Sequence, residues 1–288
     1  YFALFKPGFG HRWPGNVKKY KFNDCGGDPA CETKVVDYEG KSIGAADDPA
    51  TTEEEVGVHL NAVDLWNPNA GSIAYLNPTA CTDDATKRNL AICNCYESGG
   101  CDGPVVEKAG AGEHVKLLID TTASPPVSNR RIYTAMDDSD NTIVQVDNAD
   151  DGDAGTPEFD DTVISNTDLG VANASEREEL VKWILGWDVD DEDGDNNTNA
   201  PRWVFGDPLH SEPVVVTYGQ TSGGDPVTKL FVATNEGTIR MINTETGEEE
   251  WAFMPLEMLK IQQTLRENAN FGDSRTYGID GNIAILIK

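Results

Sequence analysis

The sequence lacks a run of 18 consecutive apolar residues, the length that a membrane-spanning helix requires. Basic residues are also scarce, because 22 lysines and arginines stand against 50 aspartates and glutamates and leave a formal net charge of −28. A charge of that size repels the phosphates of nucleic acids and the surfaces of anionic membranes. We therefore expect neither a membrane-spanning segment nor a nucleic-acid partner.

The chain has no initiating methionine and no signal peptide, and it opens directly on the strand-like run YFALF. We expect it to be an internal piece of a longer protein. Its 288 residues, of which 38% are hydrophobic, are enough for one large or two modest domains with a real core.

The six cysteines lack the spacing of a metal site. No CxxC pair occurs and no histidine lies near them, which disfavours tetrahedral zinc, and a CxxCH haem-attachment signal is absent. Their even number and a setting rich in Gly, Asp and Asn favour disulfides, and hence an exported protein. Cys25 and Cys31 are spaced to close a local loop. Three connectivities remain open for the other four, which are Cys81, Cys93, Cys95 and Cys101.

Two regions with different sequence patterns precede the first clear helix. Residues 1–22 predict a hairpin in which YFALF pairs with VKKYKF, and this hairpin would belong to the main β domain. Residues 23–174 show no sustained periodicity, hold every cysteine, and carry ten carboxylates without a base from Asp137 to Asp161. This stretch predicts an acidic, loop-dominated insertion stapled by disulfides, and its recurring aliphatic islands argue against a free linker.

The run SEREELVKWILGW predicts a helix over residues 175–187. Ser175 is expected as its N-cap, with Glu178 completing a capping box, and Gly186 or the acidic run after it ends the helix. The residues repeating at helical spacing on one face are Leu180, Trp183, Ile184 and Trp187. Packing of this face on a core is preferred over a ligand box. The helix and the acidic loop together make a segment from 175 to 201.

From residue 202 to 288 the pattern is that of regular sheet. The expected strands lie near 212–218, 228–234, 238–243 and 249–254, followed by a short helical connection and by GNIAILIK as the start of a second blade. Gly237 and Gly247 permit the tight turns, and Trp251 packs a blade on its neighbour. Four such strands are the size of one propeller blade. We therefore predict a mainly β fold with part of a propeller, the loop-rich, disulfide-stapled insertion and one short helix.

Blocks of sequence spread along the chain carry a family resemblance. They are RWPGNVKKYKF (12–22), RRIYTAM (130–136), ELVKWILGWD (179–188), FGDPLHSEPVVV (205–216), KLFVATNEGTIRMINTETGEEEWAFMP (229–255) and YGIDGN (277–282). In this order they resemble the PilY/PilC-type family of type IV pilus tip-associated biogenesis factors and adhesins. The resemblance implies an exported, modified β-propeller at the pilus tip or outer surface. This chain would hold its first blade and its closing hairpin, which is the hairpin at 1–22. Its partners would be pilins or minor pilins and a host or abiotic surface, with bound calcium tuning pilus retraction.

Calcium is the expected ligand, because its sites use several oxygens on a tight loop with Gly at the turn. In VDDEDGDNN, placing Gly194 at the sixth position of an EF-like template puts aspartates at the third, fifth and seventh positions, which are Asp191, Asp193 and Asp195. Val189 then occupies the first position, which Asp188 and Asp190 repair if the loop carries an extra residue. The alternative is a solvated acidic loop.

A second acidic segment, DNADDGDAGTPE, fits the same template less well. Ala149 occupies its third position, whereas the matching residues are Asp147, Asp151, Gly152, Asp153 and Glu158. The family's own DxDxDGxxD loop and its RGD triplet are not found in the sequence.

An enzyme is the main alternative. MINTETGEEEW resembles the tryptophan-docking motif AxDxxxGKxxW of quinone-dependent propeller oxidoreductases, with Gly247 and Trp251 in place and Met241, Asn243 and Glu248 departing from it. The motif has a structural role, and the four histidines are scattered without a nucleophile motif beside them. We therefore expect a non-enzymatic pilus-associated protein, and a cell-surface structural module without a pilus partner is the third possibility.

Overall fold

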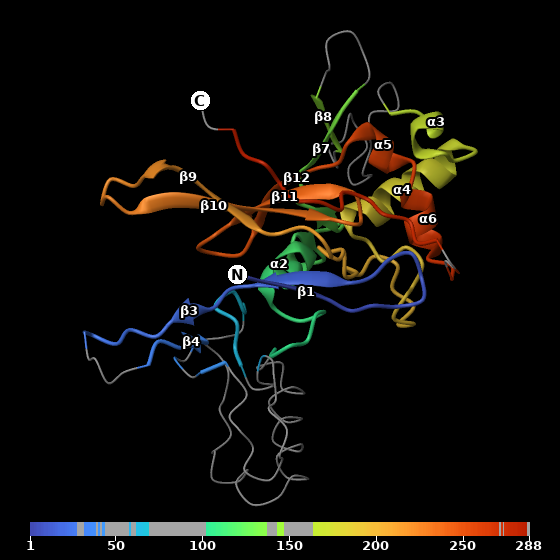
Figure 1. Ribbon diagram of the computed structural model, residues 1–288. Coiled ribbons are helices and arrows are strands. Elements are labelled where there is room, and N and C mark those ends of the chain that lie inside the picture. Colours follow the sequence, from blue (N-terminus) through green and yellow to red (C-terminus); the bar gives the residue numbers. More distant parts are fainter. Residues whose placement is uncertain are drawn as a thin grey trace, which may run out of the picture.

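The structure is a computed structural model, and it describes residues 1–27, 32–38, 40, 42–43, 58, 62–68, 102–136, 143–146, 164–270, 272 and 274–286. Over these ranges the chain is mainly β, with one six-stranded sheet, three two-stranded sheets and several short helices. None of the helices within these ranges is long and apolar enough to cross a membrane. The six-stranded sheet is central, and most of the helices gather at one end of it (Figure 1).

Four consecutive strands form an antiparallel meander in the C-terminal third. They are β9 (Val214–Gln220), β10 (Pro226–Thr234), β11 (Thr238–Asn243) and β12 (Glu249–Phe253), each paired with the next. The four strands predicted from sequence are confirmed to within two residues at each end. β11 alternates buried and half-buried residues, which is the period-2 pattern of a strand packed on a core.

The two glycines of the meander turns are required by conformation and by space. Gly237 has φ of 95° and Gly247 has φ of 81°, a left-handed region that favours glycine. A Cβ on Gly237 would lie 2.8 Å from the Met258 Cβ, and one on Gly247 would lie 2.6 Å from the Trp66 Cγ. Larger residues at either turn would displace the segment packed against it.

The sheet is wider than the predicted blade. β7 (Ile132–Ala135) lies parallel to β12, and β8 (Ile143–Val146) pairs antiparallel with β7, which gives the order β8-β7-β12-β11-β10-β9. Both added strands come from the stretch 23–174, where only aliphatic islands were recognised. Residues 281–286 are described and contain no strand, so the expected start of a second blade is not seen there. The propeller stays a prediction.

The N-terminal hairpin is confirmed as β1 (Phe2–Phe5) paired with β2 (Gly15–Lys18), in a two-stranded sheet of its own. Helix α2 (Gly110–Leu117) packs against β2 and lies between the hairpin and the main sheet (Figure 1). The other two-stranded sheets are β3 (Lys21–Phe22) with β4 (Val35–Val36), and β5 (Ile119–Asp120) with β6 (Val127–Ser128).

The prediction of a single short helix is wrong. Besides α2, the structure contains α3 (Asn166–Leu169), α4 (Ala174–Leu185), α5 (Leu256–Leu259) and α6 (Gln262–Glu267), of which α5 and α6 form the predicted helical connection. α2 escaped detection because it is short and begins with GAG, and glycine lowers helix propensity. Gly112 is needed there, since a Cβ would lie 2.2 Å from the Trp203 ring.

α4 begins earlier than its predicted capping box. Its N-cap is Asn173, whose side chain accepts a hydrogen bond from the Glu176 N–H (3.0 Å), so Ser175 lies inside the first turn. Asparagine is as good an N-cap as serine, and the Glu176 carboxylate, three residues later, accepts a hydrogen bond from the Asn173 side chain. Gly186 ends the helix in a left-handed conformation, as predicted. The residues predicted to face the core are all buried, namely Leu180, Trp183, Ile184 and Trp187.

Two apolar clusters form most of the core. The first joins α4 to β7, β8 and β12 through residues such as Leu180, Ile132, Val146 and Ala252. The second joins the hairpin and α2 to β10 and β11, and includes Val17, Val115, Leu230, Val232 and Ile242. The sheet is therefore covered over different parts of its strands by α4 and by α2 with the hairpin.

Candidate functional site

The acidic loop after α4 is closed at its neck. The Asp188 N–H donates to the Ala200 carbonyl (2.9 Å), the Arg202 N–H donates to the Gly186 carbonyl (2.9 Å), and Trp187 forms an antiparallel bridge with Pro201. Backbone pairing thus fixes both ends of the chain between residues 188 and 200. The carboxylates therefore lie on a short closed loop, and buried Trp187 anchors the neck of this loop to the core.

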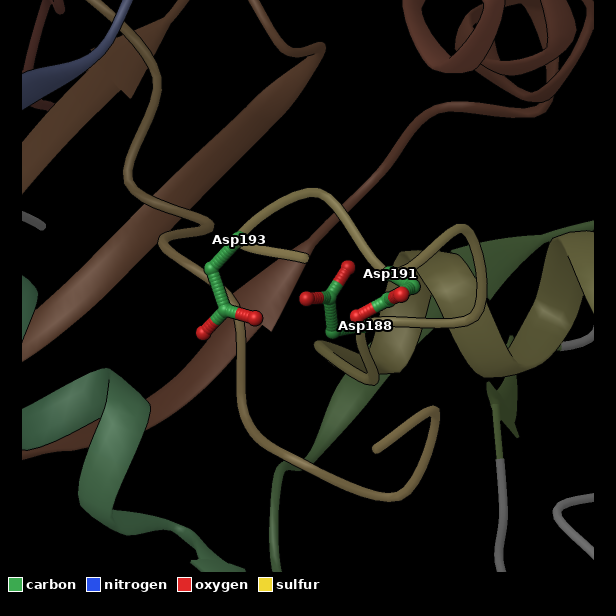
Figure 2. Close-up of side chains that lie close together, drawn as sticks. All are labelled: Asp188, Asp191 and Asp193. Carbon is green, nitrogen blue, oxygen red and sulfur yellow. The ribbon is translucent and has the colours of Figure 1, made fainter. Parts of the chain in front are cut away.

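Three carboxylates of this loop meet. One oxygen from each of Asp188, Asp191 and Asp193 lies within 4.8 Å of the others, and only Asp188 is buried. Figure 2 shows Asp193 across the loop from Asp188 and Asp191, with the three groups facing the space between them. Like charges at such spacing repel one another, and a hard cation that accepts several oxygens relieves that repulsion.

The loop backbone curls around these side chains through a ladder of short-range hydrogen bonds. Asp191 Oδ1 accepts the Asn196 N–H (2.9 Å), Asp193 Oδ1 accepts the Asp195 N–H (3.1 Å), and Asp195 Oδ1 accepts the Asn197 N–H (2.7 Å). Each of these bonds uses one carboxylate oxygen and leaves the second oxygen of the same group for another partner.

Gly194 has the left-handed φ of 74° that the predicted register requires at its sixth position, and the ladder also fits a second register. Asn196 has φ of 63° and donates to Asp191 five residues before it, so it occupies the sharp turn that the template gives to its sixth residue. Asp191, Asp193 and Asp195 then become the first, third and fifth residues. Asparagine tolerates the left-handed conformation that this second register needs.

This register leaves the twelfth position to Arg202, which cannot ligate a cation. Asp188 compensates, because its carboxylate joins the cluster from the N-terminal side of the loop. The oxygens of Asp188, Asp191 and Asp193, together with further oxygens on the same loop, are the donor set that calcium takes. The chemistry of the donors therefore fits Ca²⁺ without a nitrogen or sulfur ligand.

The other predicted ligands lie apart from the cluster. Asp190 turns to Arg266, with its two oxygens 2.7 and 2.9 Å from the guanidinium, and this hydrogen bonding lowers the pKa of Asp190. Asp195 is exposed, and its carboxylate accepts a hydrogen bond from the Asn197 N–H. The second predicted loop lies outside the described residues, with Asp147, Asp151, Asp153 and Glu158.

Two ion pairs tie the acidic loop to distant parts of the chain. Glu192 contacts Arg12 of the hairpin connection at 2.8 Å, and Asp190 contacts Arg266 of α6. Neither pair was foreseen, because partners separated by 76 to 180 residues leave no local sequence signal. The loop is thus joined to both the N-terminal hairpin and the C-terminal helical connection.

The other residues predicted from sequence are the blade tryptophan and the disulfide cysteines, which have structural roles in the prediction. Trp251 is half-buried and packs edge-on against Phe231, with ring centroids 5.9 Å apart, so its described aromatic contact is within its own sheet. Cys25 is disulfide-bonded. The other predicted disulfide cysteines lie outside the described residues, namely Cys31, Cys81, Cys93, Cys95 and Cys101.

Sequence reasoning missed several buried ion pairs. Glu249 lies between Arg130 and Arg240, Arg275 binds Asp207, and Lys18 binds Asp102 at 2.8 Å. Burial raises the pKa of Glu249, but attraction to Arg130 and Arg240 more than offsets it and leaves that pKa below its ordinary value. The period-2 pattern of β11 could have placed Arg240 on the buried face, beside Thr238 and Ile242.

His210 and Ser211 turn to different partners. The His210 Nδ1 lies 2.6 Å from the Asp280 carboxylate, whereas the buried Ser211 hydroxyl accepts a hydrogen bond from the Ala233 N–H. The two side chains therefore point to different partners, as expected for neighbours in the sequence. No family model, no curated protein and no solved structure matches this chain.

Proposed function

We propose that this chain is part of an exported, non-enzymatic protein of the type IV pilus tip or cell surface, and that its loop from 188 to 199 binds Ca²⁺. The observation that carries the calcium part is the cluster of Asp188, Asp191 and Asp193 on a loop with a closed neck. The pilus part is supported by the ordered blocks that resemble the PilY/PilC-type family, with pilins and a host or abiotic surface as partners.

Calcium would stabilise contacts between segments of the fold that lie far apart in the sequence. The loop contacts the hairpin through Glu192 and α6 through Asp190, so a cation that orders the loop also orders two segments that lie far apart in the sequence. A protein that presents a surface under tension needs such cross-connections, because local opening begins where few contacts join a segment to the rest.

Calcium titration of the purified chain tests the metal part. Thermal unfolding is followed after chelation and then with added Ca²⁺, in the native sequence and in a variant carrying Asp191→Asn and Asp193→Asn. Asp225→Asn, on the exposed β9–β10 turn, is the matched control. We expect Ca²⁺ to raise the melting temperature of the native sequence and of the control but not of the loop variant. Equal melting with chelator and with Ca²⁺ would contradict the proposal.

The pilus part needs a cellular test. Deleting the full-length gene should reduce surface pili, and the full-length protein should co-purify with pilins. Restoring the gene with the loop variant separates the two parts of the proposal. Loss of pili on deletion, together with normal piliation by the loop variant, would retain the pilus role and remove calcium from it. Normal piliation after deletion would leave a structural surface module without a pilus partner.

A further inference from the structure

A cavity of about 270 Å³ lies beneath the connection of the N-terminal hairpin. Its walls come from residues 6–14, from the end of α4 and from residues 202–206, with α6 nearby. The residues on which the argument depends are Arg12, Trp13, Arg130, Trp183, Arg202 and Trp203. The volume is slightly below the range of about 300–1,000 Å³ typical of small-molecule sites, so it suits a small ligand.

Most charged side chains lining the cavity are paired with an opposite charge. Arg12 binds Glu192 at 2.8 Å, Lys6 binds Glu107 at 3.2 Å, and Arg130 binds Glu249 at 3.0 Å. The lining residue Glu236 is paired with Arg240. Arg202 differs, because no carboxylate of the described part of the chain lies within ion-pair distance of it.

The lack of a carboxylate partner at Arg202 is unexpected in so acidic a chain. Acidic residues outnumber basic ones by 50 to 22, so a buried arginine without a carboxylate runs against the composition. A buried charge without a close counter-ion is unfavourable, and Glu192 and Asp188 attract the Arg202 guanidinium without forming an ion pair with it. Burial, and then the like charge of Arg12, lower the pKa of Arg202 well below its ordinary value.

Arg202 retains unused hydrogen-bonding capacity. Its Nε and Nη2 donate to the Trp183 carbonyl (3.2 and 2.7 Å), and its Nη1 donates to the Trp203 carbonyl (3.1 Å). The two bonds to the Trp183 carbonyl cap the C-terminal turn of α4, and the three bonds together use three of the five N–H groups of the guanidinium. The two that remain belong to the two terminal nitrogens, the pair that a carboxylate engages in a bidentate contact.

Trp183 provides the second feature. Its ring lies under the Arg202 guanidinium, with 3.7 Å from Cζ to the ring centroid, and Arg12 approaches the same ring at 5.4 Å. Its indole N–H is buried and has no acceptor among the described residues, although buried indole groups normally find one. Two cations and an unsatisfied donor thus meet around one aromatic side chain that lines the cavity.

We propose that this cavity binds a small organic monocarboxylate with a ring-shaped body, its carboxylate held by Arg202 and its ring lying among the tryptophans. A single negative charge fits better than two, because the carboxylates of Glu107, Glu192 and Glu236 also line the cavity and repel a dianion. Trp13, Trp183 and Trp203 supply the aromatic part of the lining, and the guanidinium groups of Arg275 and Arg202 lie over the rings of Trp13 and Trp183. Asp188, Asp191 and Asp193 do not line this cavity, whereas Glu192 of the same loop does.

Benzoate is the probe, and benzamide is its neutral counterpart of the same shape. Binding to the purified chain is measured by tryptophan fluorescence and by calorimetry. Arg202→Gln removes the anchor, Arg12→Gln removes the second cation while leaving the α4 cap intact, and Arg131→Gln changes an exposed arginine adjacent to Arg130 as the control. Loss of a charge-assisted contact should weaken benzoate binding at least about tenfold in Arg202→Gln, and by a smaller factor in Arg12→Gln.

The expected result is saturable one-to-one binding of benzoate, no saturable binding of benzamide, and native affinity in the Arg131→Gln control. If Arg202→Gln does not fold, Arg12→Gln decides. The proposal is overturned if benzoate does not bind, if benzamide binds equally well, or if Arg12→Gln binds benzoate with native affinity.

Discussion

Two groups of aspartates in this molecule show opposite ways of placing negative charge. Asp64 and Asp102 are buried beneath the hairpin, where Lys18 donates to Asp102 at 2.8 Å and backbone N–H groups of Lys19 and Gly110 donate to Asp64. Asp188, Asp191 and Asp193 instead meet on a surface loop. No lysine or arginine of the described ranges forms an ion pair with those three.

The two groups differ in whether the chain itself supplies the positive charge that balances the carboxylates. In the buried group, the protein itself supplies the cation and the donors, so the carboxylates join β2 to residues 62–68 and to α2. In the loop group, the chain supplies mainly backbone N–H groups and leaves the like charges facing one another. The first arrangement stabilises a fold, and the second suits an external cation.

The largest effect should come from breaking the buried group. Lys18→Met leaves Asp102 buried without its cation, and removing one partner of a buried pair costs about 3–5 kcal/mol of unfolding free energy. Chemical denaturation measures the loss. Combining Lys18→Met with Asp102→Asn should recover part of it, whereas Lys260→Met, at an exposed lysine, should change little. A Lys18→Met variant as stable as the control would show that the pair contributes no net stability.

The loop group should respond to ligand instead. Ca²⁺ at about 100 times its dissociation constant should add about 2.7 kcal/mol to the unfolding free energy. In chelator, the variant carrying Asp191→Asn and Asp193→Asn should be at least as stable as the native sequence, because fewer like charges meet. Denaturation with chelator and with Ca²⁺ measures both values. A loop variant that loses stability in chelator would assign these carboxylates to the fold, like those of the buried group.

The same contrast explains how much the sequence could predict. The meander, the hairpin and α4 follow from local periodicity and turn glycines, which are complete within about 45 residues. The parallel pairing of β7 with β12 joins residues near 132 to residues near 252, and no local pattern encodes it. The acidic loop was visible because its aspartates lie close together in the sequence, whereas Arg202 and the buried pairs depend on contacts between distant segments.

The buried group should also make the unfolding free energy depend on pH. Burial, and then the charge of Asp102, raise the pKa of Asp64 to about 7. The folded state therefore binds this proton more tightly than the unfolded state does, and Asp64 favours folding at low pH. That contribution is lost as the pH rises from about 4 to about 7. Asp64→Asn should flatten the decline in unfolding free energy over this range, and an unchanged slope would contradict the assignment.

The smallest effect is expected where the acidic loop meets α6, and its pH dependence has the opposite sign. Hydrogen bonding to Arg266 lowers the pKa of Asp190, so its contribution to stability is present above the ordinary carboxylate pKa and is lost as the pH falls through the lowered value. Because the pair is partly exposed, Asp190→Asn should cost only a few tenths of a kcal/mol at neutral pH and low salt, and less at high salt. Denaturation at two salt concentrations, with Arg266→Gln as the reciprocal variant, measures it. If Asp190→Asn abolished the Ca²⁺ response instead, Asp190 would belong to the metal site and the separation between the ligands of the loop and its tethers would be wrong.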